Sequence, residues 1–383
     1  MTHYHNYQRQ EIEFCQGSVL LLGDNAQGKS NLLEAIFLLA TTRAERASSD
    51  GDLIDWAALD EPQPVARVAA QVERRDGPLQ LEVIIAGRSQ GRQRSRVLAS
   101  KRLRVNGVAR RQIDAVGQLT AVLFDTSDLE LIGGAPAERR RYLDIALSQL
   151  DARYARALQR YGKVLAQRNA LLRRIQEGEA QADELSFWDE ELARDGALLM
   201  AQRAGAVEAL AGHARAAHRR LSGGQEELLT TYQPRLEAWD GSRARGEPAA
   251  LEAALRDALA AGRHREIGAG MTLSGPHRDD LDLALDGVDA GSFASRGQQR
   301  TAALALRLAE ARLLAEGKGD LPVVLLDDVL SELDEARRRA VVESLEEWDQ
   351  LLATSADGDR FGAGLPGRAA VFRVVAGAIE RLS

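Results

Sequence analysis

One eight-residue motif constrains the fold of this chain more than any other feature. Residues 23–30, Gly-Asp-Asn-Ala-Gln-Gly-Lys-Ser, fit the pattern G-x-x-x-x-G-K-[ST] in full. The motif follows an apolar run at 18–22 and precedes a helical pattern at 32–41, the order of elements that surrounds a bound phosphate. Its glycines let successive backbone N–H groups turn toward one anion, and the helix adds the positive end of its dipole. The motif predicts a nucleotide-binding α/β domain.

The motif also assigns roles to single residues. Lys29 would reach the β- and γ-phosphates of ATP, and the Ser30 hydroxyl would coordinate Mg²⁺. The other expected nucleotide contacts are Gly23, Asp24, Asn25, Ala26, Gln27 and Gly28. The alternative, a chance glycine-rich turn, does not account for the strand and the helix on either side.

A second motif supplies the carboxylates that such a site needs. Residues 322–328, Pro-Val-Val-Leu-Leu-Asp-Asp, predict a buried strand that ends at Asp327, where a carboxylate would hold Mg²⁺. Asp328 is then the candidate catalytic residue, because a carboxylate at this point can accept the proton of the attacking water. Many ATPases of this class carry Glu there, and the shorter Asp predicts slow hydrolysis. The alternative is that both acids cap the following helix, and the two roles are compatible.

Two segments are candidates for the signature loop through which a second copy completes an ATP site. Residues 221–225, Leu-Ser-Gly-Gly-Gln, spell the signature string of ABC-type ATPases, but a strand-like pattern follows them, and we interpret them as a helix-to-strand turn. Residues 295–300 instead begin an amphipathic helix that leads directly to the Asp327 strand. The residues expected to meet the partner's ATP are Ser295, Arg296, Gly297 and Gln298. The alternative for this segment is a simple helix cap.

The remaining patterns indicate how the chain is organised. Short alternating segments between 65 and 105 predict antiparallel strands, and the pattern from 136 to about 220 predicts long helices. A short strand at 227–232 and a helix at 248–263 follow, after which strands are expected at 281–285 and 322–326. We therefore predict an α/β head of the ABC-type P-loop class, built from 1–125 and 265–383, with a mainly helical arm at 126–264.

Composition limits where such a protein can act. The single Cys15 excludes an internal disulfide and fits a reducing cytoplasm. The longest apolar runs are well short of the roughly 20 residues that cross a bilayer, and the first residues do not resemble a signal peptide. We expect a cytoplasmic protein.

Taken together, the motifs resemble those of one family, RecF, the bacterial recombination and repair ATPases related to SMC-type and Rad-type heads. The resemblance rests on five segments in the family's order: 23–34 (GDNAQGKSNLLE), 128–144 (DLELIGGAPAERRRYLD), 275–280 (GPHRDD), 293–301 (FASRGQQRT) and 325–334 (LLDDVLSELD). It implies an ATP-dependent homodimer and a weak, DNA-stimulated ATPase that binds DNA at single-strand/double-strand junctions. It further implies work with RecO and RecR in loading RecA at gaps, and support of replication and the SOS response. The alternatives are another SMC-like head that clamps DNA and an ABC transporter subunit.

The chain also departs from the family pattern. Family members usually begin with a strand before a Phe-Arg-Asn-Tyr element, whereas this chain begins almost at that element, residues 4–7, so the first strand is expected to be missing. His5 stands where the family has Arg. The segment 122–126 lacks an expected Ser-Pro pair, so it identifies no Gln-loop residue. Thr354 lies where transporter ATPases place a His, and any γ-phosphate contact there would use its hydroxyl.

One basic segment is the candidate DNA contact, although the net charge of the chain is −7. Residues 88–111 contain nine Lys and Arg side chains and no acid, and each cation that contacts a phosphate releases counterions. The candidate DNA residues are Arg88, Arg92, Arg94, Arg96, Lys101, Arg102 and Arg104. The alternative is a solvated basic surface. A second, more mixed cluster at 139–163 could serve DNA or a protein partner.

Overall fold

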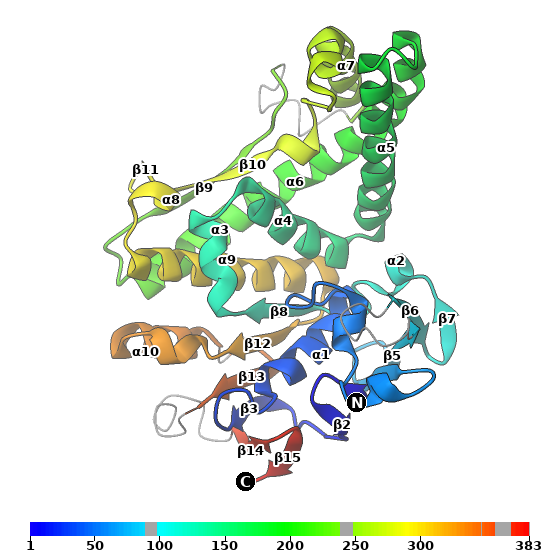
Figure 1. Cartoon of the computed structure of the whole chain (residues 1–383). Helices are drawn as coiled ribbons and strands as arrows, with labels where there is room; N and C mark the ends of the chain where they lie inside the picture. Colours follow the sequence, from blue (N-terminus) through cyan, green and yellow to red (C-terminus); the bar gives the residue numbers. More distant parts are fainter. Residues whose placement is uncertain (89–97, 238–247, 346, 357–368, 383) are drawn as a thin grey trace. The chain divides into compact units, whose positions relative to one another are not determined.

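The structure, a computed structural model, describes residues 1–88, 98–237, 248–345, 347–356 and 369–382 (Figure 1). The chain divides into two compact units: unit 1 combines Met1–Asp128 with Glu310–Ser383, and unit 2 is Leu129–Ala309. We predicted the second division after residue 264, but the structure keeps 265–309 in unit 2. The reason is that β10 (Asp280–Leu285) pairs along its whole length with β9 (Leu228–Gln233) of the arm.

A six-stranded sheet with the order β15-β14-β3-β13-β12-β8 forms the centre of unit 1. Its strands are β3 (Gly17–Leu22), β8 (Ala121–Phe124), β12 (Val323–Asp327), β13 (Gln350–Ser355), β14 (Ala370–Val375) and β15 (Ala378–Arg381). All neighbours are parallel except β15, which is antiparallel to β14. β8, β12 and β13 are almost wholly buried, and β8 and β12 are also almost wholly apolar, as in a sheet covered on both faces. The predicted strands at 18–22 and 322–326 are confirmed.

Two helices of unit 1 bear on the site. α1 (Lys29–Thr41) follows the glycine-rich loop and buries Leu33, Phe37 and Leu38 in the core. α10 (Glu335–Leu345) follows β12 after the short 3-10 turn η7 (Val329–Glu332). The predicted helix at 32–41 is confirmed, and it begins three residues earlier, at Lys29 itself.

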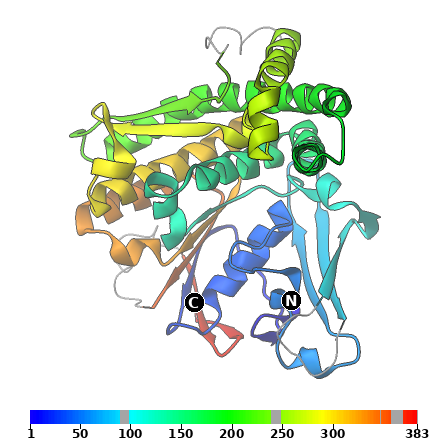
Figure 2. The ribbon, with the colours of Figure 1, turned by 45° about the horizontal axis from the view of Figure 1, so that its top comes forward.

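A second six-stranded sheet of unit 1, with the order β2-β1-β4-β5-β6-β7, is antiparallel throughout (Figure 2). Its strands are β1 (Thr2–Tyr4), β2 (Tyr7–Arg9), β4 (Val65–Val72), β5 (Leu79–Arg88), β6 (Leu98–Val105) and β7 (Val108–Arg110). The predicted hairpins are confirmed, with a tight turn at Asn106 and Gly107. The expectation of a missing first strand is wrong, because β1 precedes the Tyr4–Tyr7 turn and pairs with both β2 and β4.

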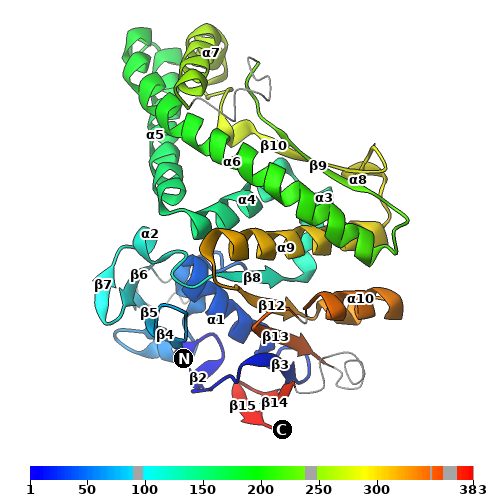
Figure 3. The ribbon, with the colours of Figure 1, turned by 180° about the vertical axis from the view of Figure 1, so that it is seen from behind.

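Helices make up most of unit 2, as predicted (Figure 3). They are α3 (Leu129–Gly133), α4 (Pro136–Leu150), α5 (Ala152–Gln176), α6 (Leu185–Leu221), α7 (Pro248–Ala269) and α8 (Ala290–Phe293). A small antiparallel sheet, β11-β10-β9, includes the short β11 (Val288–Asp289). The helix α9 (Arg296–Lys318) begins in unit 2 and ends in unit 1. No helix in the described part of the chain is both long and apolar enough to span a membrane.

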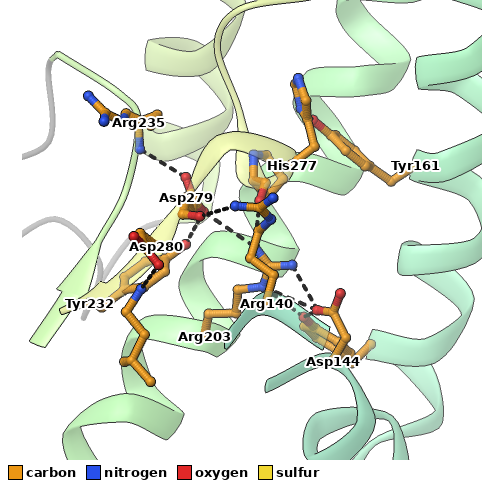
Figure 4. Close-up of polar contacts among 12 residues, drawn as sticks. Arg140, Asp144, Tyr161, Arg203, Tyr232, Arg235, His277, Asp279 and Asp280 are labelled. Atoms are coloured by element: carbon orange, nitrogen blue, oxygen red, sulfur yellow. Dashed lines mark hydrogen bonds and ion pairs between the residues drawn. The ribbon is translucent and has the colours of Figure 1, made fainter. Parts of the chain in front are cut away.

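Two of the sequence motifs meet in the interior of unit 2, where Arg203 of α6 joins them (Figure 4). The buried Arg203 guanidinium donates hydrogen bonds to Asp144 Oδ1 (2.7 Å) from the 128–144 motif and to the Pro276 carbonyl (2.6 Å) from the 275–280 motif. It also lies 3.5 Å from Asp279, which accepts a hydrogen bond from the hydroxyl of Tyr232 on β9. Burial raises the pKa of Asp279, although these donors and cations oppose the shift.

His277 lies beside this cluster and is held neutral (Figure 4). Its Nδ1 lies 2.7 Å from the Tyr161 hydroxyl and its Nε2 lies 3.1 Å from the Thr272 carbonyl, so Nε2 donates and Nδ1 accepts. Burial lowers the pKa of His277 to about 4, because the charged imidazolium would lose hydration there. Residues of the 128–144 and 275–280 motifs therefore form buried contacts that stabilise the interior of unit 2.

Candidate functional site

The glycine-rich loop lies between β3 and α1 of unit 1, where the sequence placed it. Two of its residues adopt left-handed backbone angles, Ala26 with φ 63° and Gly28 with φ 114°. The backbone angle favours glycine at position 28, and a Cβ there would lie 2.6 Å from the Asn6 amide and displace that side chain. This geometry gives the loop the tight curvature on which anion binding by backbone N–H groups depends.

Lys29 is folded back onto the loop. Its Nζ donates hydrogen bonds to the carbonyl oxygens of Gly23 (2.6 Å) and Asp24 (2.8 Å). Burial lowers the pKa of Lys29, while the carboxylates of Asp328, Asp327 and Asp24 act in the opposite direction. The ammonium group is thus held at the mouth of the loop by carbonyl oxygens that a phosphate oxygen can replace as acceptors.

Ser30 and Asp327, the two predicted Mg²⁺ ligands, lie in direct contact. The Ser30 hydroxyl donates a hydrogen bond to Asp327 Oδ1 (2.9 Å), and Asp327 is buried at the end of β12. Thr354 of the neighbouring strand β13 donates a second hydrogen bond to the same oxygen (2.8 Å). A hydroxyl and a carboxylate side by side are oxygen ligands of the type that Mg²⁺ prefers. Within the described residues no group of three or more His, Cys, Asp or Glu side chains could hold a metal.

Asp328 follows in an unusual backbone conformation. Its φ is 55°, which Asp tolerates better than most residues, and its backbone N–H donates to the Thr354 hydroxyl (2.9 Å). The hydroxyl of Thr354 therefore contacts both acids at once. We predicted that this hydroxyl could contact a γ-phosphate, but in the structure its proton is used by Asp327 and its oxygen by Asp328.

Arg46 is a site residue that we did not predict from the sequence. It lies beyond the end of α1, and its guanidinium forms an ion pair with Asp327 Oδ2 and lies 3.8 Å from Asp125 Oδ2. Burial alone would lower the pKa of Arg46, but Asp327, Asp125 and Glu34 together raise it above its ordinary value. No motif marks Arg46. Its position a few residues after the helix of the loop is the only signal that could have suggested it.

The Tyr4–Tyr7 turn packs against the same loop. His5 lies 2.8 Å from Glu34 Oε2 on α1, and the Tyr7 hydroxyl donates to the Gly28 carbonyl (2.8 Å). Burial alone would raise the pKa of Glu34, but the contact with His5 and the hydrogen bond from the Arg46 N–H outweigh it and lower the pKa. His5, the residue that replaces the family's Arg, therefore pairs with a buried carboxylate of α1.

The second group of predicted site residues lies in unit 2, at the start of α9. Ser295 and Gln298 form a reciprocal cap: the Ser295 N–H donates to Gln298 Oε1 (2.7 Å), and the Gln298 N–H donates to Ser295 Oγ (3.3 Å). Ser295 and Arg296 are exposed, and Gly297 is half-buried. The predicted helix start is confirmed, and the exposed hydroxyl lies at the positive end of a 23-residue helix.

The literal signature string has the structure that we predicted for it. Leu221 is the last residue of α6, and the next residues turn into β9. Gly223 and Gly224 adopt φ values of 67° and 77°, and the Gly224 N–H caps the helix by donating to the Arg219 carbonyl (2.7 Å). No helix begins at this string, so it presents no helix dipole to an anion.

The candidate DNA residues fall into three groups. Arg92, Arg94 and Arg96 lie outside the described residues. Lys101 is buried and bonded to Asp50 (2.6 Å) and to the Thr42 carbonyl, so it is a structural cation and not a surface one. Arg88, Arg102 and Arg104 are exposed.

Three exposed cations of this sheet, Arg67, Arg102 and Arg104, share one face. Arg102 on β6 pairs with Ile84 on β5, and the same β5 residue pairs on its other side with Arg67 of β4. Arg104 and Arg67 both contact the single carboxylate of Glu82 (3.3 and 2.5 Å). Arg67 was not predicted, because it lies outside the acid-free segment and reaches this face only through strand pairing. The face remains basic, because the one carboxylate of Glu82 is shared by two arginines.

Comparisons with known proteins agree with this geometry. Residues 1–363 match the family model described as the RecF/RecN/SMC N terminal domain. A protein named DNA replication and repair protein RecF from Chloroflexus aggregans is 46% identical over 378 residues, which cover 97% of this chain and 95% of that protein.

Solved structures support the same assignment. The structure titled recombination mediator protein RecF-ATP in the RecFOR pathway has a TM-score of 0.85 at 32% identity and covers 100% of this chain and 96% of its own. An Smc head bound to the C-winged helix domain of ScpA shares the fold alone, with a TM-score of 0.51 at 18% identity over 99% of this chain and 94% of its own. The fold is therefore that of an ABC-type ATPase head, and the chain belongs to the RecF family of DNA replication and repair proteins.

Proposed function

We propose that this chain is an ATP-dependent DNA-binding recombination mediator that dimerises when it binds ATP. It would bind DNA at single-strand/double-strand junctions, act with RecO and RecR, and support RecA loading, gap repair, replication and SOS induction. The contact between Ser30 and Asp327 at the end of β12 carries the ATP part of this proposal. It brings the loop and the acidic strand together as a phosphate and Mg²⁺ site requires.

Each residue of the nucleotide site has a role in this proposal. The backbone of residues 23–28 would surround the phosphates, Lys29 would bind the β- and γ-phosphates, and Ser30 and Asp327 would hold Mg²⁺. Bound Mg²⁺ would neutralise charge on the phosphates. Because Asp327 Oδ2 is paired with Arg46, the ligand positions nearest to Ser30 are on Asp327 Oδ1.

Asp328 would accept the proton of the attacking water. The hydrogen bond from its N–H to Thr354 fixes its backbone, and this fixes the point from which its short side chain extends. The reach of Asp is one methylene less than that of Glu, which fits a slow ATPase that uses hydrolysis as a dimerisation switch.

The capped start of α9 would complete the ATP site of a second copy. Ser295, Arg296, Gly297 and Gln298 present a hydroxyl, a cation and a helix N-terminus, which together suit a γ-phosphate. The proposal is therefore a homodimer in which each chain contributes a loop to one site and a helix start to the other.

Analytical ultracentrifugation with and without ATP and Mg²⁺ tests the ATP-driven dimer. We expect the chain to be monomeric alone and dimeric with ATP and Mg²⁺, whereas Lys29→Ala stays monomeric because its contact to the phosphates is lost. A dimer that forms equally without ATP, or in Lys29→Ala, would show that nucleotide does not drive the assembly.

DNA binding is tested on a gapped duplex at several salt concentrations. Replacement of both Arg88 and Arg102 by alanine should weaken binding and reduce the salt slope by about two, since each phosphate contact contributes roughly one to that slope. An unchanged slope in this variant would place the DNA on another surface.

A further inference from the structure

Two hairpin turns from opposite ends of the chain meet on one residue of the glycine-rich loop, Gln27. One turn joins β1 to β2 and carries Asn6, and the other joins β14 to β15 and carries Ala376 and Gly377. All of these residues belong to unit 1. Neither turn is part of the phosphate-binding motif at residues 23–30.

The contacts hold both the backbone and the side chain of Gln27. Its carbonyl oxygen accepts hydrogen bonds from Asn6 Nδ2 (2.9 Å) and from the Gly377 N–H (3.0 Å). Its side-chain Oε1 accepts from the Ala376 N–H (2.7 Å). Asn6 in turn accepts a hydrogen bond from Asn31 of α1 (2.8 Å), so one side chain connects the loop to its helix.

The bonds that the two turns donate to Gln27 are all accepted by oxygen atoms of the loop. The Tyr7 hydroxyl likewise donates to the carbonyl of Gly28. Because the turns bond to carbonyl and side-chain oxygens, these contacts use none of the N–H groups of the loop. The two residues that flank Gln27, Ala26 and Gly28, both have left-handed backbone angles, and such a conformation persists at a non-glycine residue only when its surroundings hold it.

We propose that Asn6 and the Ala376–Gly377 turn clamp Gln27 and so position the loop backbone for phosphate binding. The inference rests on the proposed ATP binding, and it assigns to the β14–β15 hairpin a positioning role at the nucleotide site. Asn6, Gln27 and Gly377 are positioning residues, since none of them is required to contact the reacting atoms through its side chain.

The clamp leaves no space for a larger residue at its centre. A Cβ atom added to Gly377 would overlap the carbonyl oxygen of Asn6, and the φ of Gly377 is 77°. A matched turn lies in the other sheet of unit 1: Gly107 has φ 75° and no atom within 4 Å of an added Cβ. Both glycines follow a residue that also has positive φ, Ala376 (49°) and Asn106 (51°). Substitution by alanine therefore adds the same backbone-angle strain to both turns, and only Gly377→Ala also adds a clash within the clamp.

The test compares Gly377→Ala with Gly107→Ala in the full chain. We expect Gly377→Ala to raise the Kd for ATP about tenfold, since a displaced loop would lose hydrogen bonds to the charged phosphates and tenfold corresponds to only about 1.4 kcal/mol. Gly107→Ala should change the Kd less than about twofold, although its backbone strain also lowers stability without nucleotide. Asn6→Ala, which removes a donor without adding strain, should weaken ATP binding in the same direction as Gly377→Ala. Equal ATP affinities in the two glycine variants would overturn the clamp.

A second measurement keeps the clamp separable from the proposed ATP binding. The Leu32 N–H donates to the Gly28 carbonyl (3.1 Å), so its hydrogen exchange without nucleotide reports the position of the loop. Gly377→Ala should accelerate this exchange and Gly107→Ala should not. If the unmodified chain fails to bind ATP, the proposed function is wrong, and the exchange comparison still decides whether the clamp exists.

Discussion

The hydroxyl of Ser30 donates a hydrogen bond of 2.9 Å to Asp327, although 297 positions separate the two residues in the sequence. Ser30 follows β3 by way of the loop and Asp327 ends β12, and these two strands are not neighbours in the sheet, because β13 lies between them. β13 therefore separates the strand before the loop from the acidic strand, and its Thr354 contacts Asp327. Neither end of the chain could form the nucleotide site without the other.

Thr354→Val should lower both the folding stability and the rate of ATP hydrolysis. The substitution keeps the shape but removes the donor to Asp327 and leaves the Asp328 N–H without its acceptor, which costs about 1–3 kcal/mol of folding stability. We also expect slower ATP hydrolysis, because Asp328 loses its anchor. Thr230→Val is the matched control, since the buried Thr230 hydroxyl has no hydrogen-bond partner in the described structure. Urea unfolding checks this, and equal stability changes in the two variants would contradict it.

Asp328→Asn should keep ATP bound and block its hydrolysis. An amide cannot accept the proton of the attacking water, whereas Asn tolerates the left-handed φ of 55° as well as Asp does. We therefore expect a dimer that persists with ATP, measured by ultracentrifugation and by phosphate release. Asp349→Asn, an exposed acid just before β13, should hydrolyse ATP like the unmodified chain. Normal phosphate release by Asp328→Asn would exclude Asp328 as the proton acceptor.

Ser295→Arg should abolish ATP-driven dimerisation while the chain still binds ATP. The substitution places a bulky side chain where the partner's γ-phosphate would lie, whereas the phosphate-binding loop belongs to unit 1 and is unchanged. Ser222→Arg in the literal signature string should dimerise normally, at a cost of about 1 kcal/mol because Ser222 is half-buried. The reverse result, with Ser222→Arg monomeric and Ser295→Arg dimeric, would make the literal string the true signature.

Mixing two inactive chains should restore part of the ATPase activity. A dimer of Ser295→Arg with Lys29→Ala contains one intact site, formed by Lys29 of the first chain and Ser295 of the second. Phosphate release from the mixture, compared with each variant alone, measures the recovery. No recovery from two chains that both fold and bind each other would argue against sites completed by a partner.

The free energy of unfolding of unit 2 should decrease as the pH is lowered from 6.5 to 4. In this window the unfolded chain protonates His277, whereas burial holds the folded pKa at about 4, so protons favour unfolding by up to about 3 kcal/mol. His277→Gln should flatten the pH dependence of urea unfolding in this range. His264→Gln, at an exposed position on α7, should leave it unchanged. A pH dependence that is identical in all three proteins would contradict the role of His277.

Local signals in the sequence predicted most of the fold and the two main parts of the nucleotide site. The loop, the acidic strand and the start of α9 are each specified by neighbouring residues, so pattern and capping rules were sufficient. The second domain boundary could not be predicted, because the pairing of β10 with β9 joins residues about fifty positions apart. Arg46 and Arg67 were missed for a related reason. Their roles depend on side chains that only the folded sheets bring near them.

The cluster around Arg203 limits which substitutions the sequence of this chain can accept during evolution. Arg203, Asp144 and Asp279 come from three separate segments, and loss of one partner from a buried ion pair typically costs about 3–5 kcal/mol. Single replacements at these positions would therefore leave an uncompensated charge, and tolerated changes must occur together. A chimera that receives α4 from a relative should fold only when that helix keeps an acid at position 144 to pair with Arg203. In recombination between related genes, the three segments that carry Arg203, Asp144 and Asp279 would therefore have to stay compatible with one another.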